Sequence, residues 1–455
     1  MTKALAKKLN DSAVARWSVL AIVSVTMMCG YFITDVMAPL QSMLQTNFGW
    51  ESTEYGLFTS SYGWFNVTLF MLIIGGIILD KKGMRFTGTF ACCLMLIGCG
   101  LKYYAVSPFF LMEGSLFGIK IQVLMASIGF ATFGVGVETA GITVTKVISR
   151  WFKGKEIALA MGLQVAMARI GTALALSITV PVAKHFNDIS VPILLGLGLL
   201  CIGLIAYLVF CVMDRKLDES IKEAENNTEA EEGFRLKDIK LIVTNKGFWL
   251  IAILCVLFYS AVFPFLKYAT SLMMNKYGVE EELAGSIPSL LPFGTILLTP
   301  LFGGIYDKIG KGASIMIFGS LLLVIVHTCF AMPFLNVWWF AAIVMVILGI
   351  AFSLVPSAMW PSVPKIIPQK QLGTAYSMIF WVQNIGLSGV PMLIGWVLNK
   401  YCQTGNPAMP YDYTLPMIIF ASFGILAILV AFMLKAEDKK MGYGLEKPNI
   451  KKIEA

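Results

Sequence analysis

A chain of 455 residues in which 57% are hydrophobic and only 14% are charged is not an ordinary soluble domain, where about a quarter of residues are charged. The net charge of +8 does not indicate nucleic-acid binding, because the 35 Lys and Arg residues are scattered over short loops without aromatic residues between them. The composition instead predicts an integral membrane protein.

The apolar stretches predict an all-α membrane protein with twelve transmembrane helices. Each lasts about 20 residues or more without strict alternation, and only helices and closed barrels satisfy every backbone group in lipid. The predicted spans are 17–40, 55–79, 86–106, 121–147, 157–180, 191–213, 248–272, 283–305, 314–332, 337–363, 372–398 and 413–434.

The charge distribution predicts how the chain is oriented. The N-terminal segment is basic and enters a first span that is too long for a cleaved signal peptide. Most Lys and Arg residues lie in the termini and in the loops on the same side, which predicts that both termini are cytoplasmic. No Asn-x-Ser/Thr sequon falls in a predicted outer loop, which favours a bacterial inner (plasma) membrane over a lysosomal one. The nine cysteines show no metal-binding spacing, so we expect no metal and no cofactor.

Two opposite charges stand near the outer ends of the first and seventh spans. Asp35 lies about 27 Å along a helix from Trp17, and Lys267 lies about 28 Å from Phe248. We hypothesise that they form an outer-gate ion pair that breaks when the protein opens outward. The alternative is that each side chain reaches water independently.

A short repeat divides the chain into two parts. The strings GGIILDKKGMR (75–85) and GGIYDKIGKG (303–312) both place a Gly four residues before an Asp and another Gly three residues after it. This spacing predicts an N-terminal six-helix bundle (1–213), a cytoplasmic linker (214–246), a C-terminal six-helix bundle (247–434) and a cytoplasmic tail (435–455). We interpret Asp80, Arg85 and Asp307 as gating residues that bridge helix ends, although an ordinary basic loop remains an alternative.

Two charged residues lie deep within consecutive spans. Glu138 stands twelve residues before Arg150, and Arg169 stands twelve residues after Ile157. Both are therefore about 18 Å from the same membrane face, within a hydrocarbon layer about 30 Å thick. A charge at that depth costs on the order of 3 kcal/mol and by default indicates a functional site. A carboxylate and a guanidinium at one depth predict a site for a zwitterion.

The repeat, the twelve spans and the long central loop resemble the major facilitator superfamily, which implies two pseudo-symmetric bundles with a site between them at mid-membrane. Strings across both halves are similar to the lysosomal dipeptide transporters of that superfamily: YFITD (31–35), YGWFNV (62–67), RWFKGKE (150–156), GLQVAMARIG (162–171), FYSAVFPF (258–265) and QLGTAYSMIFWVQNIGL (371–387). This resemblance implies a dipeptide carrier that works by alternating access, with Glu138 and Arg169 in the substrate cavity. Gly129 and Phe130 replace an Arg-containing string of that family, and the N-terminus lacks an acidic dileucine sorting signal.

We expect Glu138 to bind the amino group of a dipeptide and Arg169 its carboxylate, because a guanidinium matches a carboxylate bidentately. The alternative is that Glu138 and Arg169 pair only to hold their helices together. Polar and aromatic residues expected to line the rest of the cavity are Tyr62, Trp64, Asn66, Tyr259, Trp360, Trp381, Gln383 and Asn384.

Other functions fit the sequence less well. An organic-anion or sugar-phosphate carrier would need several cations and no carboxylate in its cavity, so Glu138 argues against it. A non-transporting membrane sensor or an enzyme would need a nucleotide loop, a metal cluster or a nucleophile, and none of these patterns appears. Uniport and proton-linked transport both remain open. We expect the protein to function as a monomer in the lipid bilayer, with an accessory subunit left open.

Overall fold

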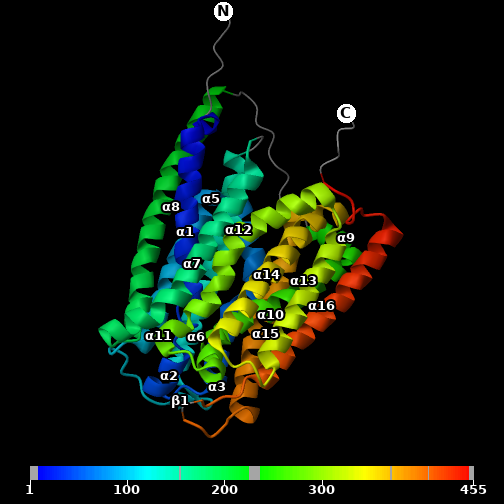
Figure 1. The fold of residues 1–455 in the computed structure, drawn as a ribbon. Coiled ribbons are helices and arrows are strands. Elements are labelled where there is room, and N and C mark those ends of the chain that lie inside the picture. The colour runs from blue at the N-terminus through cyan, green and yellow to red at the C-terminus, as the bar shows by residue number, and fades with distance from the viewer. Residues whose placement is uncertain (1–8, 153–154, 225–235, 369–370, 408, 450–455) are drawn as a thin grey trace, which may run out of the picture.

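The computed structural model describes residues 9–152, 155–224, 236–368, 371–407 and 409–449. Long helices make up most of the described chain, as Figure 1 shows, and confirm the prediction of an all-α membrane protein. Both chain ends lie at the same end of the molecule, here called the terminal end. The elements α2, α3 and β1 lie at the opposite end, which we call the outer end after the predicted orientation. Residues 225–235 of the predicted linker and 450–455 of the predicted tail lie outside the described chain.

The helices of the two halves follow the predicted spans closely. The N-terminal half contains η1 (Leu9–Asp11), α1 (Ala13–Asp35), α2 (Gln41–Phe48), α3 (Ser52–Ser60), η2 (Ser61–Gly63), α4 (Trp64–Thr68), α5 (Met71–Val106), the strands β1 (Ser115–Leu116) and β2 (Ile119–Lys120), α6 (Ile121–Trp151), α7 (Ile157–Phe186) and α8 (Ser190–Ala224). After α9 (Leu236–Val243), the C-terminal half contains α10 (Lys246–Tyr277), α11 (Glu281–Ala284), α12 (Ser286–Ile309), α13 (Gly312–Ala331), α14 (Trp338–Ile366), α15 (Leu372–Tyr401) and α16 (Thr414–Met441).

Eleven helices of the described chain are long and apolar enough to cross a membrane. Gly83 has a left-handed φ of 79° and interrupts α5, a conformation that glycine adopts without a steric penalty. Before this break Asp80 pairs with Lys146 of α6, whereas after it Gly98 lies against Phe133 of α6. The part of α5 after the break matches the predicted third span, and the part before it is the end of the predicted second span.

The part of the predicted second span nearest the outer end is not one continuous helix. It consists of α3, the single 3₁₀ turn η2 and the short α4, and it is separated from α5 at Leu69 and Phe70. Phe70 has a φ of 53°, which is strained for a bulky side chain and requires support from its surroundings. Its ring stacks on Trp381 of α15 with centroids 5.5 Å apart. The break thus lies at a contact between the two halves.

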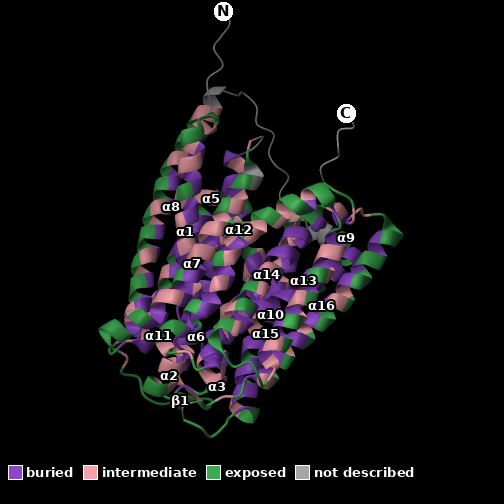
Figure 2. Cartoon of the chain, viewed as in Figure 1, coloured by how far each residue is buried: buried purple, intermediate pink, exposed green. Residues whose placement is uncertain are grey.

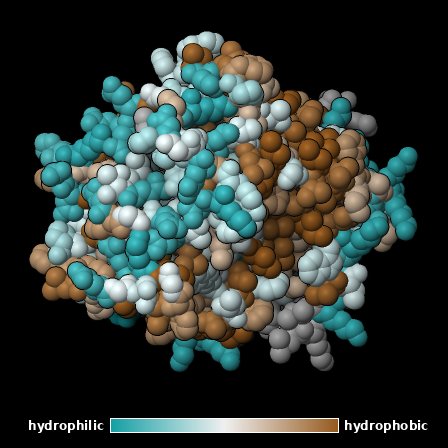
Figure 3. Space-filling view, turned by 90° about the horizontal axis from the view of Figure 1, so that it is seen from below, coloured by the Kyte–Doolittle hydropathy of each residue, from teal (hydrophilic) through white to brown (hydrophobic). Residues whose placement is uncertain are grey.

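The surface of the bundle is typical of a protein that faces lipid. Buried residues follow the inner faces of the helices and exposed residues the outer ones (Figure 2). Large apolar side chains such as Ile97, Leu208 and Phe432 are about half exposed on long helices. Viewed from the outer end, hydrophilic residues cover much of the molecule and hydrophobic residues gather to one side (Figure 3).

The two halves are packed tightly at the outer end. A methyl group at Gly56 of α3 would stand 2.8 Å from the Pro391 carbonyl oxygen of α15, so these helices touch through their backbones. Asn399 also donates to Glu51 at 3.0 Å, and Lys184 pairs with the α11 residue Glu281 at 3.1 Å. On the terminal side of Trp381, no hydrogen bond or ion pair joins described residues of the two halves. The structure is therefore closed at the outer end.

The beginning of the predicted tail folds back onto the C-terminal half. The Glu446 carboxylate accepts hydrogen bonds from the Ser314 backbone N–H at 3.0 Å and the Ser314 hydroxyl at 2.9 Å, in the first turn of α13. Leu445 is fully buried, and Asn449 Nδ2 donates to Asp307 Oδ1 at 2.7 Å. Glu446 and the Leu445 carbonyl, which accepts from the Gly312 N–H, thus satisfy N–H groups at the start of α13 that have no partner within the helix.

Candidate functional site

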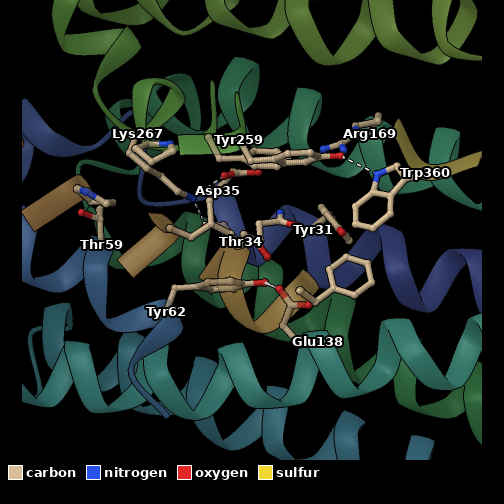
Figure 4. A pocket seen from close by; sticks show the side chains of 16 residues that line it. Tyr31, Thr34, Asp35, Thr59, Tyr62, Glu138, Arg169, Tyr259, Lys267 and Trp360 are labelled. Carbon is tan, nitrogen blue, oxygen red and sulfur yellow. Dashed lines mark hydrogen bonds and ion pairs between the residues drawn. The ribbon is translucent and has the colours of Figure 1, made fainter. Parts of the chain in front are cut away.

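A pocket between the two halves contains both charges that the sequence singled out. Its volume is about 180 Å³, which is small compared with the roughly 300–1,000 Å³ of sites for drug-sized ligands. Figure 4 shows Glu138 beside Tyr62 on one side of this pocket and Arg169 beside Tyr259 and Trp360 on the other. The lining residues are Tyr31, Thr34, Asp35, Thr59, Tyr62, Glu138, Arg169, Tyr259, Phe263, Pro264, Lys267, Trp360, Phe380, Gln383, Leu387 and Pro391.

Glu138 is held in place by a tyrosine from the interrupted second span. The Tyr62 hydroxyl donates to Glu138 Oε1 at 2.7 Å. This contact depends on Gly134, one turn earlier on α6, because a methyl group there would stand 2.1 Å from the Tyr62 carbonyl oxygen. Tyr62 leaves Oε2 open for a further donor.

Arg169 lies among aromatic rings and has no acidic partner. Its guanidinium carbon stands 5.8 Å from the Tyr31 ring centroid, 5.3 Å from that of Phe263 and 5.1 Å from that of Phe352. Within the described part of the chain, its nitrogen atoms form no hydrogen bond or ion pair. Aromatic faces stabilise a cation without using its N–H donors. The donors of Arg169 are thus available to a ligand.

Glu138 and Arg169 do not pair with each other among the described residues. The alternative in which they pair to hold α6 and α7 together is therefore wrong for this conformation. The carboxylate is occupied by Tyr62, and the guanidinium is surrounded by rings, so each charge has a separate environment. The two sides of the pocket consequently offer opposite charges to one ligand.

The predicted pair Asp35 and Lys267 forms one wall of the same pocket. Lys267 Nζ donates to Asp35 Oδ1 at 2.6 Å and to the Thr34 carbonyl at 2.7 Å. The two charged side chains are only 11% and 12% exposed, so the alternative of independent access to water is wrong in this conformation. Tyr55 of α3 donates to the Lys267 carbonyl at 2.8 Å and adds a further link between the halves.

The remaining predicted cavity residues divide into two groups. Tyr259, Trp360 and Gln383 line the pocket, and Trp360 Nε1 donates to the Tyr259 hydroxyl at 3.0 Å. Four others lie outside the lining and correct the predicted set: Trp64, Asn66, Trp381 and Asn384.

Local contacts account for these four positions. Trp64 Nε1 donates to Ser60 Oγ at 3.1 Å, one turn earlier in the same segment. Trp381 Nε1 donates to the Val67 carbonyl at 3.2 Å, so it bridges the halves beside the helix break. Asn66 and Asn384 are each 1% exposed, which places them within the protein packing.

The predicted gating residues of the repeat lie within their own halves. Asp80 pairs with Lys146 at 2.7 Å, and Arg85 pairs with Asp218 of α8 at 2.7 Å. Asp307 accepts a hydrogen bond from Asn449 of the tail. None of these contacts crosses between the halves, so at the terminal end they stabilise each half separately in this conformation.

Tyr31 and Phe263 line the pocket but were not among the predicted cavity residues. Their spacing in the sequence could have identified them. Tyr31 stands four residues before Asp35, and Phe263 stands four residues before Lys267. Residues four apart share one helix face, so both rings face the same pocket as the ion pair. The third ring at Arg169, Phe352 of α14, had no such signal, because its position depends on tertiary packing.

The described residues contain no group of three or more His, Cys, Asp or Glu side chains that could hold a metal ion. The pocket combines opposite charges, aromatic walls and hydroxyl groups, which suits noncovalent binding of a small polar molecule.

Comparisons with known proteins agree with this architecture. The sequence profile described as Major Facilitator Superfamily matches residues 20–391 and 268–452. A protein named lysosomal dipeptide transporter MFSD1 from Mus musculus is 28% identical over 440 residues, covering 93% of this chain and 88% of its own length. The Homo sapiens protein of the same name is 29% identical over 382 residues, covering 81% and 77%. A crystal structure of a mutant nucleoside transporter NupG has a TM-score of 0.67 at 16% identity, covering 91% of this chain and 99% of its own.

Proposed function

Because this chain belongs to the Major Facilitator Superfamily and is a membrane transporter, not an enzyme, we propose that it carries dipeptides or similar small zwitterions by alternating access. The observation that supports this substrate class most directly is the unpaired guanidinium of Arg169 in the same pocket as Glu138. The relatives named dipeptide transporters, at 28–29% identity, support it as well.

The proposed binding mode assigns one end of the ligand to each side of the pocket. The carboxylate of a dipeptide binds the guanidinium of Arg169 bidentately, while its ammonium binds Glu138, which Tyr62 orients. Each charge-assisted hydrogen bond contributes about 1.5–3 kcal/mol. The rings of Tyr259, Trp360 and Phe380 then contact the peptide side chains.

Alternating access requires the outer contacts to separate and the terminal end to close. The Asp35–Lys267 ion pair is the proposed outer gate, because it joins the two halves beside the bound ligand. Asp80, Arg85 and Asp307 are proposed to stabilise the opposite, terminally closed state through contacts that are not formed here. Transport is then either uniport or coupled to a proton, and the two are distinguished by whether uptake needs a pH gradient.

Proposals on location follow from the sequence and the relatives together. The protein is a multi-pass membrane protein. The relatives are named as lysosomal, which weighs against the bacterial inner membrane that the sequence favoured. From the charge distribution, we propose that both termini are cytoplasmic. The proposed domains are the two six-helix bundles, the linker that connects them and the tail. The proposed functional unit is a monomer, and the question of an accessory subunit stays open.

A thermal-shift screen of the purified protein tests the substrate class. A ligand present at about 100 times its Kd stabilises the folded state by about 2.7 kcal/mol, which raises Tm by several degrees. We expect this increase with dipeptides, a smaller one with free amino acids, and none with sugar phosphates. Glu138→Gln should lose the increase for dipeptides while keeping the Tm of the unliganded protein. Stabilisation by sugar phosphates alone would instead support an organic-anion carrier.

A further inference from the structure

Lys102 on α5 is a charged group that the proposed binding mode does not use. Its side chain is fully buried in the N-terminal half. Its ammonium lies 4.2 Å from the ring centroid of Phe130, 5.5 Å from that of Phe133 and 5.8 Å from that of Phe58. A lysine buried at membrane depth is energetically costly and by default indicates a functional role.

The ammonium of Lys102 has one polar partner, and that partner is close to the gate. Lys102 Nζ donates to the Ile33 carbonyl at 3.0 Å, two residues before Asp35 on α1. The described chain offers it no carboxylate within ion-pair distance. The last carbonyls of α1, those of Ile33 and Thr34, thus bind two lysines, Lys102 from the same half and Lys267 from the other. Both ammonium groups also lie within 6 Å of the Phe130 ring centroid, Lys267 at 5.8 Å.

Opening of the outer end would separate these groups unequally. Lys267 belongs to the C-terminal half and would move away, whereas Lys102 and Asp35 belong to the same half and would stay together. Removing one partner of a buried ion pair is strongly destabilising, because the other charge is left uncompensated. A second cation that already stands beside the end of α1 removes that penalty.

We propose that Lys102 is a positioning residue for the gate, which takes over the Asp35 carboxylate when Lys267 withdraws and so stabilises the outward-open state. This inference rests on the proposed alternating-access function. It adds a residue within the N-terminal half that controls how readily the gate opens. A structural alternative is that Lys102 only caps the C-terminus of α1, which a cation favours in any conformation.

Distances between spin labels at the outer end distinguish these roles without any substrate. Labels are attached to Phe186→Cys at the end of α7 and Leu283→Cys on α11, which are 61% and 59% exposed and belong to different halves. The two cysteines exposed in the described chain, Cys93 and Cys201, are replaced by alanine in this background. The fraction of molecules with the longer distance reports outward opening.

We expect Lys267→Met to increase the outward-open fraction, because it removes the closing partner of Asp35. Adding Lys102→Gln should then lower that fraction about fivefold, whereas Lys102→Arg should maintain it. Glutamine retains a donor for the Ile33 carbonyl and removes only the charge. In a variant that also carries Asp35→Asn, Lys102→Gln should leave the fraction unchanged, because the carboxylate it serves is absent.

The controls separate the possible failures. Lys276 also caps backbone carbonyls, donating to Phe330 at 2.6 Å away from the gate, and Lys276→Gln should leave the outward-open fraction unchanged. If Lys267→Met does not open the outer end, the gate and with it the proposed transport cycle are contradicted. Lys267→Met can instead open the outer end while Lys102→Gln has no effect on the outward-open fraction, or has the same effect in the Asp35→Asn background. In either case Lys102 is a structural cap and this inference is overturned. Lys102→Met replaces Lys102→Gln if that variant does not fold.

Discussion

At the scale of single residues, Arg169 shows how a buried charge can be stabilised and still remain free to bind. Three aromatic faces surround its guanidinium, and no described side chain occupies its N–H donors. Had Glu138 paired with it directly, a ligand would first have to break that ion pair. Tyr62 prevents this by holding the Glu138 carboxylate on the other side of the pocket. In the proposed binding mode, the pocket is thus organised for a ligand with two opposite charges before the ligand arrives.

Replacing Arg169 tests that arrangement. Arg169→Ala should weaken dipeptide binding about 100-fold, since losing one partner of a desolvated charge pair costs about 2–5 kcal/mol. Arg169→Lys should recover only part of the affinity, because an ammonium does not form the bidentate contact. Isothermal titration of the purified variants measures both effects. Val165→Ala, at an exposed position of the same helix, is the matched control and should bind normally. Equal affinities for Arg169→Ala and the control would contradict the assignment.

The sequence alone predicted both charges, because ionisable residues are rare within apolar spans and their distance from the membrane face can be counted. It also predicted the Asp35–Lys267 pair from the similar distances of the two residues along the first and seventh spans. It did not predict that Trp64, Asn66, Trp381 and Asn384 would lie outside the pocket lining. The direction in which a polar residue faces depends on the rotation of its helix and on local breaks in that helix. The apolar pattern of the sequence does not determine either one when a span is buried on several sides.

At the scale of helices, the glycines at close contacts determine where the pocket residues lie. Gly134 allows η2 to approach α6 so closely that Tyr62 reaches Glu138. The break in the second span between α4 and α5 was not predicted, because residues 55–79 read as one continuous apolar run. Its cause is the left-handed backbone at Phe70, a residue type from which sequence reasoning does not expect that conformation.

Gly134→Ala tests the importance of this close approach. The added methyl group would stand 2.1 Å from the Tyr62 carbonyl oxygen, so α6 and η2 must move apart. We expect a loss of about 1–3 kcal/mol of stability, as for other overpacked cores, together with weaker dipeptide binding as Tyr62 leaves Glu138. Thermal unfolding and titration measure the two effects. Gly162→Ala on α7 has no atom within 4 Å of the new methyl group and should keep both properties. A Gly134→Ala protein as stable as this control would show that the contact is unimportant.

At the scale of the whole molecule, the contacts between the halves are concentrated at the outer end. Backbone contact at Gly56, the Asp35–Lys267 pair and the Lys184–Glu281 pair all lie on that side. Between described residues, the terminal end has no comparable hydrogen bond or ion pair beyond Trp381. In the proposed alternating-access cycle, this conformation corresponds to the state that is closed at the outer end.

Exchanging the charges of the gate tests whether the ion pair acts between the halves. Asp35→Lys and Lys267→Asp should each reduce uptake into proteoliposomes about 100-fold, because each leaves two like charges in a buried contact. The double variant restores an ion pair and should recover a substantial part of the uptake. Exchanging Lys184 and Glu281 in the same way, at a partly exposed pair between the halves, should have little effect. A double variant no better than the single ones would argue against the gate.

The docked start of the tail has a consequence for how the protein can be produced. Glu446 and Leu445 belong to the folded C-terminal half, since one accepts hydrogen bonds from Ser314 and the other is fully buried. A polypeptide shortened to Met441 would leave the first turn of α13 without this acceptor and uncover an apolar contact. Affinity tags and fluorescent reporters therefore belong after residue 449, where they leave these interactions intact.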